Sequence, residues 1–261
     1  MLRTFVRAVE FRRERVSARS TPGGRAILLD IEGTTTPIAF VVDVLFPYAR
    51  RHLRRHLERH ATRPDYQLLF DRFRYDHASR QRAGDPVPMW VDRPATARLA
   101  SVAAYAEWLI DRNSKSTALK DLQGKIWQEG YERGELAGEV LEDVPRAFER
   151  WRAAGVQIGI FSSGSVLAQQ LLFRHSSAGD LGRFLRWHFD TTTGSKTDVD
   201  SYRRIGAATG IPTEDISFIS DTTRELEAAR RAGMDVRLAV RPGNVPQGEH
   251  DFVEIRSFDE L

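Results

Sequence analysis

Apolar residues are grouped in two ways along the first half of the chain. The segment AILLDI, residues 26–31, is short, continuous and apolar, as expected of a strand buried on both faces of a parallel sheet. Residues 42–60 instead carry apolar side chains at helical spacing, with arginines on the opposite face. Pro47 should begin or kink that helix. The helical pattern continues to about residue 140, so the sequence predicts one buried strand followed by a long helical insertion.

Beyond residue 140, apolar runs of strand length alternate with helical segments of about ten residues. This alternation is typical of an α/β fold with a doubly wound parallel sheet. The predicted strands are residues 156–161, 186–192, 215–220, 235–240 and 251–255, and the predicted helices are residues 143–154, 199–210 and 223–233.

Composition limits the classes of protein to consider. The chain has 261 residues, of which 41% are apolar, and this is enough for one sizeable core and an accessory unit. It has no cysteine, which excludes disulfides and thiolate metal sites and fits a reducing compartment. No apolar run approaches the roughly 20 residues of a membrane-spanning helix. We therefore expect a soluble, cytoplasmic protein without a membrane partner.

Arginine dominates the basic residues. Of 39 lysines and arginines, only four are lysines, namely Lys115, Lys120, Lys125 and Lys196. Such a bias is typical of a GC-rich bacterial genome, and the net charge of +3 is weak evidence for a nucleic-acid partner. We expect no nucleic-acid binding.

Residues 1–24 form a separate segment that ends in Pro-Gly-Gly. The segment carries six arginines, as a transit peptide would, but Glu10 and Glu14 argue against that interpretation. We interpret it as a mobile N-terminal extension or as the product of a start codon assigned too early.

Chemistry is expected where the predicted strands end, because ligands of open α/β sheets bind beyond the carboxyl ends of the strands. Taken singly, the residues there could be turn or helix-cap residues. Taken together, they suit phosphoryl transfer: a carboxylate that attacks phosphorus needs a divalent cation held by acids, with lysine and hydroxyl donors on the phosphate oxygens. These residues are Asp30 and Glu32 after the first strand, Ser162, Ser163 and Gly164 after the second, Lys196 after the third and Asp221 after the fourth.

The order of DIEGT, FSSGS, a lone lysine and FISD resembles the haloacid dehalogenase-like superfamily of aspartate-nucleophile phosphatases. Longer stretches are similar to the enolase-phosphatases of the methionine salvage pathway, among them LLDIEGTTTPIAFVVDVLFPYAR, STALKDLQGKIWQEGY, IFSSGSVLAQQLLF and VRPGN. The resemblance covers the chain from about Ile27 to Asn244. It implies an HAD-like, Rossmannoid catalytic core at residues 25–41 and 141–261, with an inserted helical cap at residues 42–140.

The resemblance also implies roles for the acidic residues and the lysine. Asp30 would be the nucleophile, forming an aspartyl-phosphate, and a magnesium ligand. Glu32 stands where the superfamily usually has the aspartate that serves as acid and base, and it would contribute to the metal site. Lys196 would hold the nucleophile and the phosphate together, and Asp221 would complete the magnesium ligands. Glu225, one helical turn after Asp221, could contact these residues without binding the ion itself.

Other residues would bind the substrate. By resemblance, Ser162, Ser163 and Gly164 would donate hydrogen bonds to the phosphate, together with Lys196. In the cap, three neighbouring polar residues are candidates to line the pocket, although we favour a solvated helix face for them. They are Lys115, Lys120 and Gln123.

The family's reaction implies a bifunctional enolase-phosphatase of the acireductone synthase type. It converts 2,3-diketo-5-methylthiopentyl 1-phosphate, a small phosphorylated substrate, to 1,2-dihydroxy-3-keto-5-methylthiopentene and phosphate, by enolisation followed by hydrolysis. The resemblance further implies one Mg²⁺ per subunit and a monomer. The base for enolisation stays open between Glu32 and a cap lysine with a lowered pKa.

Two rival functions use similar residues. The first is a capped phosphatase for another small phosphate ester, because the core motifs do not encode the leaving group. The second is a phospho-receiver domain, but receiver domains are shorter and lack a large helical insertion. His52, His56 and His60 have a spacing that could bind a metal. Since arginines lie between them, we predict a plain surface face instead.

Overall fold

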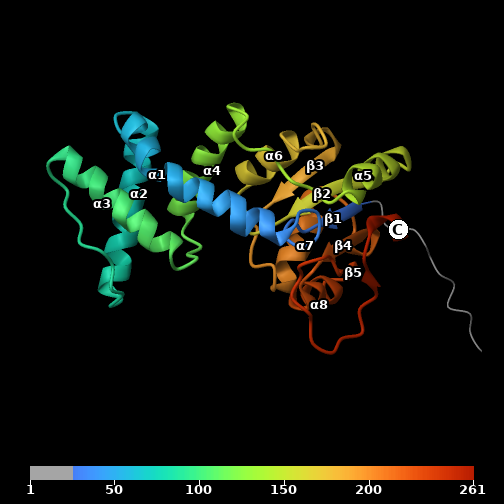
Figure 1. Ribbon diagram of the computed structural model, residues 1–261. Coiled ribbons are helices and arrows are strands. Elements are labelled where there is room, and N and C mark those ends of the chain that lie inside the picture. Colours follow the sequence, from blue (N-terminus) through green and yellow to red (C-terminus); the bar gives the residue numbers. More distant parts are fainter. Residues whose placement is uncertain (1–25) are drawn as a thin grey trace, which may run out of the picture.

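The structure is a computed structural model that describes residues 26–261 (Figure 1). The predicted N-terminal extension, residues 1–24, lies outside the described residues. Among residues 26–261, no helix combines the length and the apolar character needed to cross a membrane.

A six-stranded, wholly parallel sheet forms the core. The first strand lies inside the sheet, where Leu29 is paired with Ile160 on one side and with Ile219 on the other. The strand order is β3-β2-β1-β4-β5-β6, which confirms the predicted doubly wound α/β fold. The strands are β1 (Ala26–Leu29), β2 (Gln157–Phe161), β3 (Leu185–Phe189), β4 (Ile216–Ser220), β5 (Asp235–Ala239) and β6 (Glu254–Ile255).

Helices cover both faces of the sheet. This explains why β1 is apolar at every position. Ile27 and Leu29 belong to the hydrophobic core formed with α5 and α6, whereas Ala26 and Leu28 belong to the core formed with α7 and α8. Successive side chains of a strand point to opposite faces, so each face of β1 is buried. The helices are α5 (Asp143–Ala153), α6 (Val166–Arg174), α7 (Val199–Thr209) and α8 (Thr223–Arg231).

The insertion after β1 is helical, as predicted, and lies to one side of the sheet (Figure 1). Pro47 lies in the first turn of α1, where the π-helix passes directly into it, so the helical segment begins several residues before the proline. Each of the four α-helices of the insertion contributes a fully buried leucine to the same hydrophobic core that covers Ile27 and Leu29 of β1, namely Leu53, Leu69, Leu109 and Leu122. The division into a cap at residues 42–140 and a flanking core stays a prediction. The elements are a π-helix (Phe40–Leu45), α1 (Phe46–His60), α2 (Pro64–Arg82), α3 (Ala95–Ile110) and α4 (Thr117–Glu132).

The prediction of a plain surface face for the histidines of α1 was wrong for His56, which is 1% exposed. Its Nδ1 lies 3.3 Å from Oε2 of Glu129 on α4, and His60 Nε2 lies 2.5 Å from Oε1 of the same carboxylate. Arg59 and Arg133 also form ion pairs with Glu129. Because two guanidinium groups already neutralise this carboxylate, we interpret the cluster as an ion-pair network between α1 and α4 and not as a metal site.

Burial in this network lowers the pKa of His56 to about 4. Burial alone would raise the pKa of Glu129, but its contacts with His60, His56 and Arg59 outweigh that effect and lower the pKa to about 2. Both groups therefore have a lower pKa in the folded protein than in the unfolded chain, and both should stabilise the fold less as the pH falls.

We predict that the free energy of unfolding falls between about pH 6.5 and pH 4 through His56. In this range the imidazole takes up a proton in the unfolded chain but not in the folded protein. The loss should reach about 1.4 kcal/mol per pH unit at most. Urea unfolding across this range should show a shallower pH dependence for His56→Gln than for the wild type. His52→Gln, one helical turn earlier, is the control, and an unchanged slope in His56→Gln would contradict the prediction.

Candidate active site

The predicted site residues meet at the carboxyl ends of the central strands. Asp30 directly follows β1, Ser162 follows β2 and Asp221 follows β4. The chain order of the strands reverses direction at β1, which is where open α/β sheets place their ligands. Residues predicted from three separate segments are thus brought to one edge of the sheet.

A buried lysine lies between two carboxylates at this edge. Lys196 Nζ is 2.6 Å from Asp30 Oδ1 and 2.6 Å from Glu225 Oε2. The lysine loop is held by the buried Tyr202 on α7, whose hydroxyl donates to the carbonyl oxygen of Lys196 at 2.6 Å. Burial alone would lower the pKa of Lys196, but Asp30 and Glu225 outweigh it and raise the pKa. The amine is therefore a fixed positive charge.

More carboxyl groups meet here than one lysine can neutralise. Burial, and next the charge of Asp30, raise the pKa of Glu32, of Asp221 and of Glu225, the last to about 7. Carboxylate oxygens crowded in this way are the ligands that Mg²⁺ prefers. The donor set therefore fits a divalent cation, which would relieve the mutual repulsion.

The loop after β1 turns sharply, and one of these carboxylates packs closely against it. Gly33 has φ +68°, and a Cβ at this position would stand 2.4 Å from Asp221 Oδ2. The three threonines that follow are fully buried, and their backbone N–H groups all donate to the carbonyl oxygen of Ile31. Thr35 Oγ1 also donates to the carbonyl oxygen of Asp30 at 3.2 Å. The glycine therefore lets Asp221 approach the backbone closely, and the threonines fix the turn that carries it.

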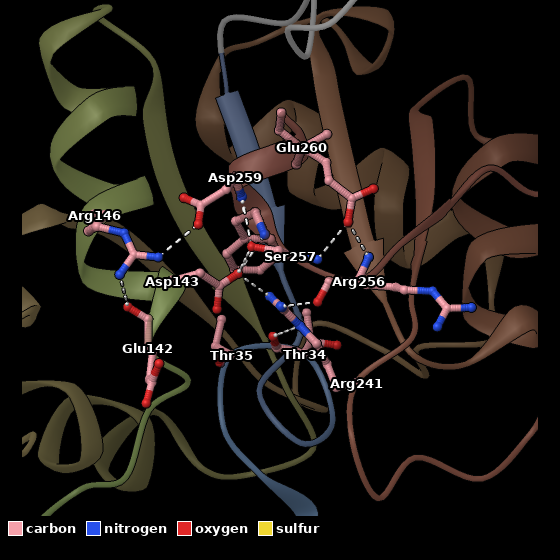
Figure 2. A network of polar contacts seen from close by, with 12 residues as sticks. Thr34, Thr35, Glu142, Asp143, Arg146, Arg241, Arg256, Ser257, Asp259 and Glu260 are labelled. Atoms are coloured by element: carbon pink, nitrogen blue, oxygen red, sulfur yellow. Dashed lines mark hydrogen bonds and ion pairs between the residues drawn. The ribbon is translucent and has the colours of Figure 1, made fainter.

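The same turn is held from the far end of the chain by two residues to which sequence reasoning gave no role. Arg241 Nε donates to the carbonyl oxygen of Thr34 at 3.3 Å, and its Nη2 pairs with Asp143 at 2.8 Å (Figure 2). Asn244 Nδ2 donates to the carbonyl oxygen of Gly33 at 2.9 Å. Both residues belong to the VRPGN segment after β5, which the resemblance had already singled out.

Hydrogen-bond donors are arranged at the start of α6. Ser162 is buried, and its Oγ accepts from the N–H of Gly164 at 3.2 Å. The side chain of Gln169 donates to the carbonyl oxygens of Gly164 and Phe189, which holds the loop against β3. The hydroxyl group of Ser162 is thereby oriented next to the N-terminal end of a helix, a place that favours anions.

A cavity of about 390 Å³ opens between this edge of the sheet and the helical insertion. Glu32, Ser162, Ser163 and Gly164 line it from the sheet side, and Lys115, Lys120 and Gln123 line it from the insertion. The expectation of a solvated helix face was therefore wrong for Gln123, which is buried.

Two parts of the cavity wall differ in character. Lys120 Nζ, on the helical insertion, donates to Thr191 Oγ1 in the loop after β3 at 3.1 Å. Burial, and next the charge of Lys115, lower the pKa of Lys120. Elsewhere the wall is apolar, with Phe46 and Trp127 among its residues. The cavity thus suits a small molecule with an anionic end and an apolar end.

Comparisons with known proteins agree with this geometry. The family model for haloacid dehalogenase-like hydrolases matches residues 25–233. The enolase-phosphatase E1 of Synechococcus elongatus is 49% identical over 235 residues, which cover 90% of this chain and 96% of that protein. The chain belongs to the enolase-phosphatase E1 family of haloacid dehalogenase-like hydrolases. It is thus a phosphatase-type enzyme of this family.

Further relatives show how the family's unit is used. A probable bifunctional methylthioribulose-1-phosphate dehydratase/enolase-phosphatase E1 of Populus trichocarpa is 45% identical over 249 residues, but this chain spans only 48% of that longer protein. The crystal structure of the UTR4 protein of Saccharomyces cerevisiae matches with a TM-score of 0.74 and 29% identity, over 91% of this chain and 100% of that one. The CbbY structure from Rhodobacter sphaeroides, in complex with phosphate, shares the fold at a TM-score of 0.53 and 19% identity, over 91% of this chain and 96% of that one.

We predict that Gly33→Ala lowers phosphatase turnover roughly 100-fold, because the new Cβ would displace Asp221 from its position. The positive φ should also cost about 1–3 kcal/mol of stability. Turnover of a generic phosphate ester and thermal unfolding would measure the two effects. Gly84→Ala is the matched control, since Gly84 also has a positive φ but an added Cβ there meets nothing within 4 Å. Equal turnover in the two variants would contradict the displacement of Asp221.

Proposed function

We propose that the protein is a magnesium-dependent enolase-phosphatase that acts on 2,3-diketo-5-methylthiopentyl 1-phosphate. It would form the enol first and then release phosphate, leaving 1,2-dihydroxy-3-keto-5-methylthiopentene. The observation that carries the proposal is the buried 2.6 Å contact between Lys196 Nζ and Asp30 Oδ1, beside a cavity that a helical layer covers. The relatives named enolase-phosphatase E1 support both activities.

Asp30 would be the nucleophile. Its carboxylate attacks phosphorus, a bond forms from Asp30 to phosphorus, and the bond from phosphorus to the substrate oxygen breaks. Lys196 neutralises the attacking carboxylate and holds a phosphate oxygen. The Ser162 hydroxyl group donates to a second phosphate oxygen, and the Gly164 N–H group keeps that hydroxyl oriented. These contacts favour the charge that develops on the phosphate oxygens.

Glu32 would transfer the protons of the phosphatase step. With its pKa raised by burial and by Asp30, it can protonate the leaving oxygen and then take a proton from the water that releases phosphate from Asp30. Asp30, Asp221 and the main-chain carbonyl group of Glu32 would hold the Mg²⁺ ion, which neutralises charge so that a carboxylate can approach a phosphate dianion. The Glu32 side chain thus stays free for proton transfer.

Enolisation needs a base for a proton on carbon, and the cavity holds two. Glu32 has a raised pKa, and Lys120 has a lowered one. Both line the cavity, from the sheet and from the helical insertion respectively. The apolar side of the cavity, with Phe46 and Trp127, suits the methylthio end of the substrate. The insertion would also exclude water while the enol is present.

We predict that Asp30→Asn stops phosphate release from the diketo phosphate in the presence of Mg²⁺, because an amide oxygen is a far weaker nucleophile than a carboxylate. The enol signal should persist, since Asp30 does not remove the carbon-bound proton. Optical detection of the enol alongside a phosphate assay would follow both steps. Asp43→Asn, at an exposed acid of the π-helix, is the control and should release phosphate as the wild type does.

The two-step reaction requires that the wild type form enol before phosphate and lose both activities with a chelator. Undiminished phosphate release in Asp30→Asn would exclude this residue as the nucleophile. Phosphate release from generic esters without any enol signal would replace the proposal by a capped phosphatase for another small phosphate ester.

A further inference from the structure

The side-chain orientation of Asn244 is fixed by its neighbours. Its Nδ2 lies 2.9 Å from the carbonyl oxygen of Gly33 and 3.1 Å from the carbonyl oxygen of Ala239. Both neighbours are acceptors, so only the amide nitrogen can face them. The turn that presents Asn244 is closed by its own N–H group, which donates to the carbonyl oxygen of Arg241 at 3.1 Å.

The amide oxygen must therefore point the other way, and it points toward the acidic cluster. A Cβ on Gly33 would collide with both Asn244 Oδ1 and Asp221 Oδ2, so the two oxygens lie close together against the same side of Gly33. Asn244 Oδ1 is buried and has no hydrogen-bond partner among residues 26–261. Leaving a buried acceptor unpaired costs about 1–3 kcal/mol, so a donor from outside the protein is expected there.

We propose that Asn244 is a positioning residue of the magnesium site, whose Oδ1 accepts a hydrogen bond from the hydration shell of the ion. The inference rests on the proposed function, which places Mg²⁺ at Asp30, Glu32 and Asp221. Magnesium keeps several waters when a protein binds it, and those waters need acceptors. Asn244 supplies a neutral acceptor next to Asp221, and the same amide group fixes the turn behind Glu32.

An asparagine suits this position better than an aspartate. A carboxylate would turn an oxygen toward the carbonyl oxygens of Gly33 and Ala239, where the present contacts require a donor. It would also add charge to a cluster in which burial and Asp30 already raise the pKa of Asp221. The amide group donates to the two carbonyl oxygens and adds no charge to the cluster.

The test is the affinity of the full chain for Mg²⁺ without substrate, by titration calorimetry, with thermal unfolding in EDTA as a second measurement. We predict that Asn244→Ala and Asn244→Leu, which keeps the branched shape without polar atoms, bind Mg²⁺ about 10- to 100-fold more weakly than the wild type. Arg241→Lys is the matched control. It loosens the same turn at Thr34, away from the acidic cluster, so it should lower the unfolding temperature in EDTA but keep the magnesium Kd within about twofold.

Three results would count against the inference, and they differ in what they overturn. Wild-type affinity in both Asn244 variants would exclude a role of the amide at the metal. An equal loss of affinity in Arg241→Lys would mean that the turn alone matters. A wild-type protein that binds no Mg²⁺ would overturn the metal site of the proposed function, and this inference with it.

Discussion

The site depends on the burial of one lysine between two carboxylates. Lys196 could not stay charged in the interior without Asp30 and Glu225, because an unpaired buried charge is strongly unfavourable. The three residues come from the loop after β3, the end of β1 and the first turn of α8. The ion pairs therefore form only when these three segments are correctly placed by the fold. Removing one partner would leave another buried charge unpaired.

A second constraint is that several carboxylates must be held close together in fixed positions. The turn after β1 meets this requirement. Gly33 supplies the positive φ and the missing side chain, and the buried threonines fix the backbone behind it. Arg241 and Asn244 then hold the turn from the opposite end of the chain. Rigidity is useful here, because phosphoryl transfer relies on positioning and electrostatics.

The sequence was sufficient for the central strands and for most residues of the site, because β1, β2 and β4 are mostly apolar and Asp30, Ser162 and Asp221 follow their ends directly. It was insufficient where a contact joins distant segments. Arg241 and Thr34 are 207 positions apart, and nothing local to either residue indicates the bond between them. His56 is another example. Its arginine neighbours in the sequence predicted an exposed side chain, but packing against Glu129 of another helix buries it.

The place of the insertion in the chain explains how one cavity can serve two kinds of contact. The π-helix Phe40–Leu45 begins only a few residues after the turn at Gly33. Its Val41 and Leu45 line the cavity together with Phe46 at the start of α1. The chain thus leaves the anionic end of the site and immediately forms its apolar wall. Lys120, on the last helix of the insertion, donates a hydrogen bond to Thr191 in the loop after β3. Any movement of the insertion must therefore change the apolar wall and the lysine contact together, while the turn at Gly33 stays fixed by Asn244.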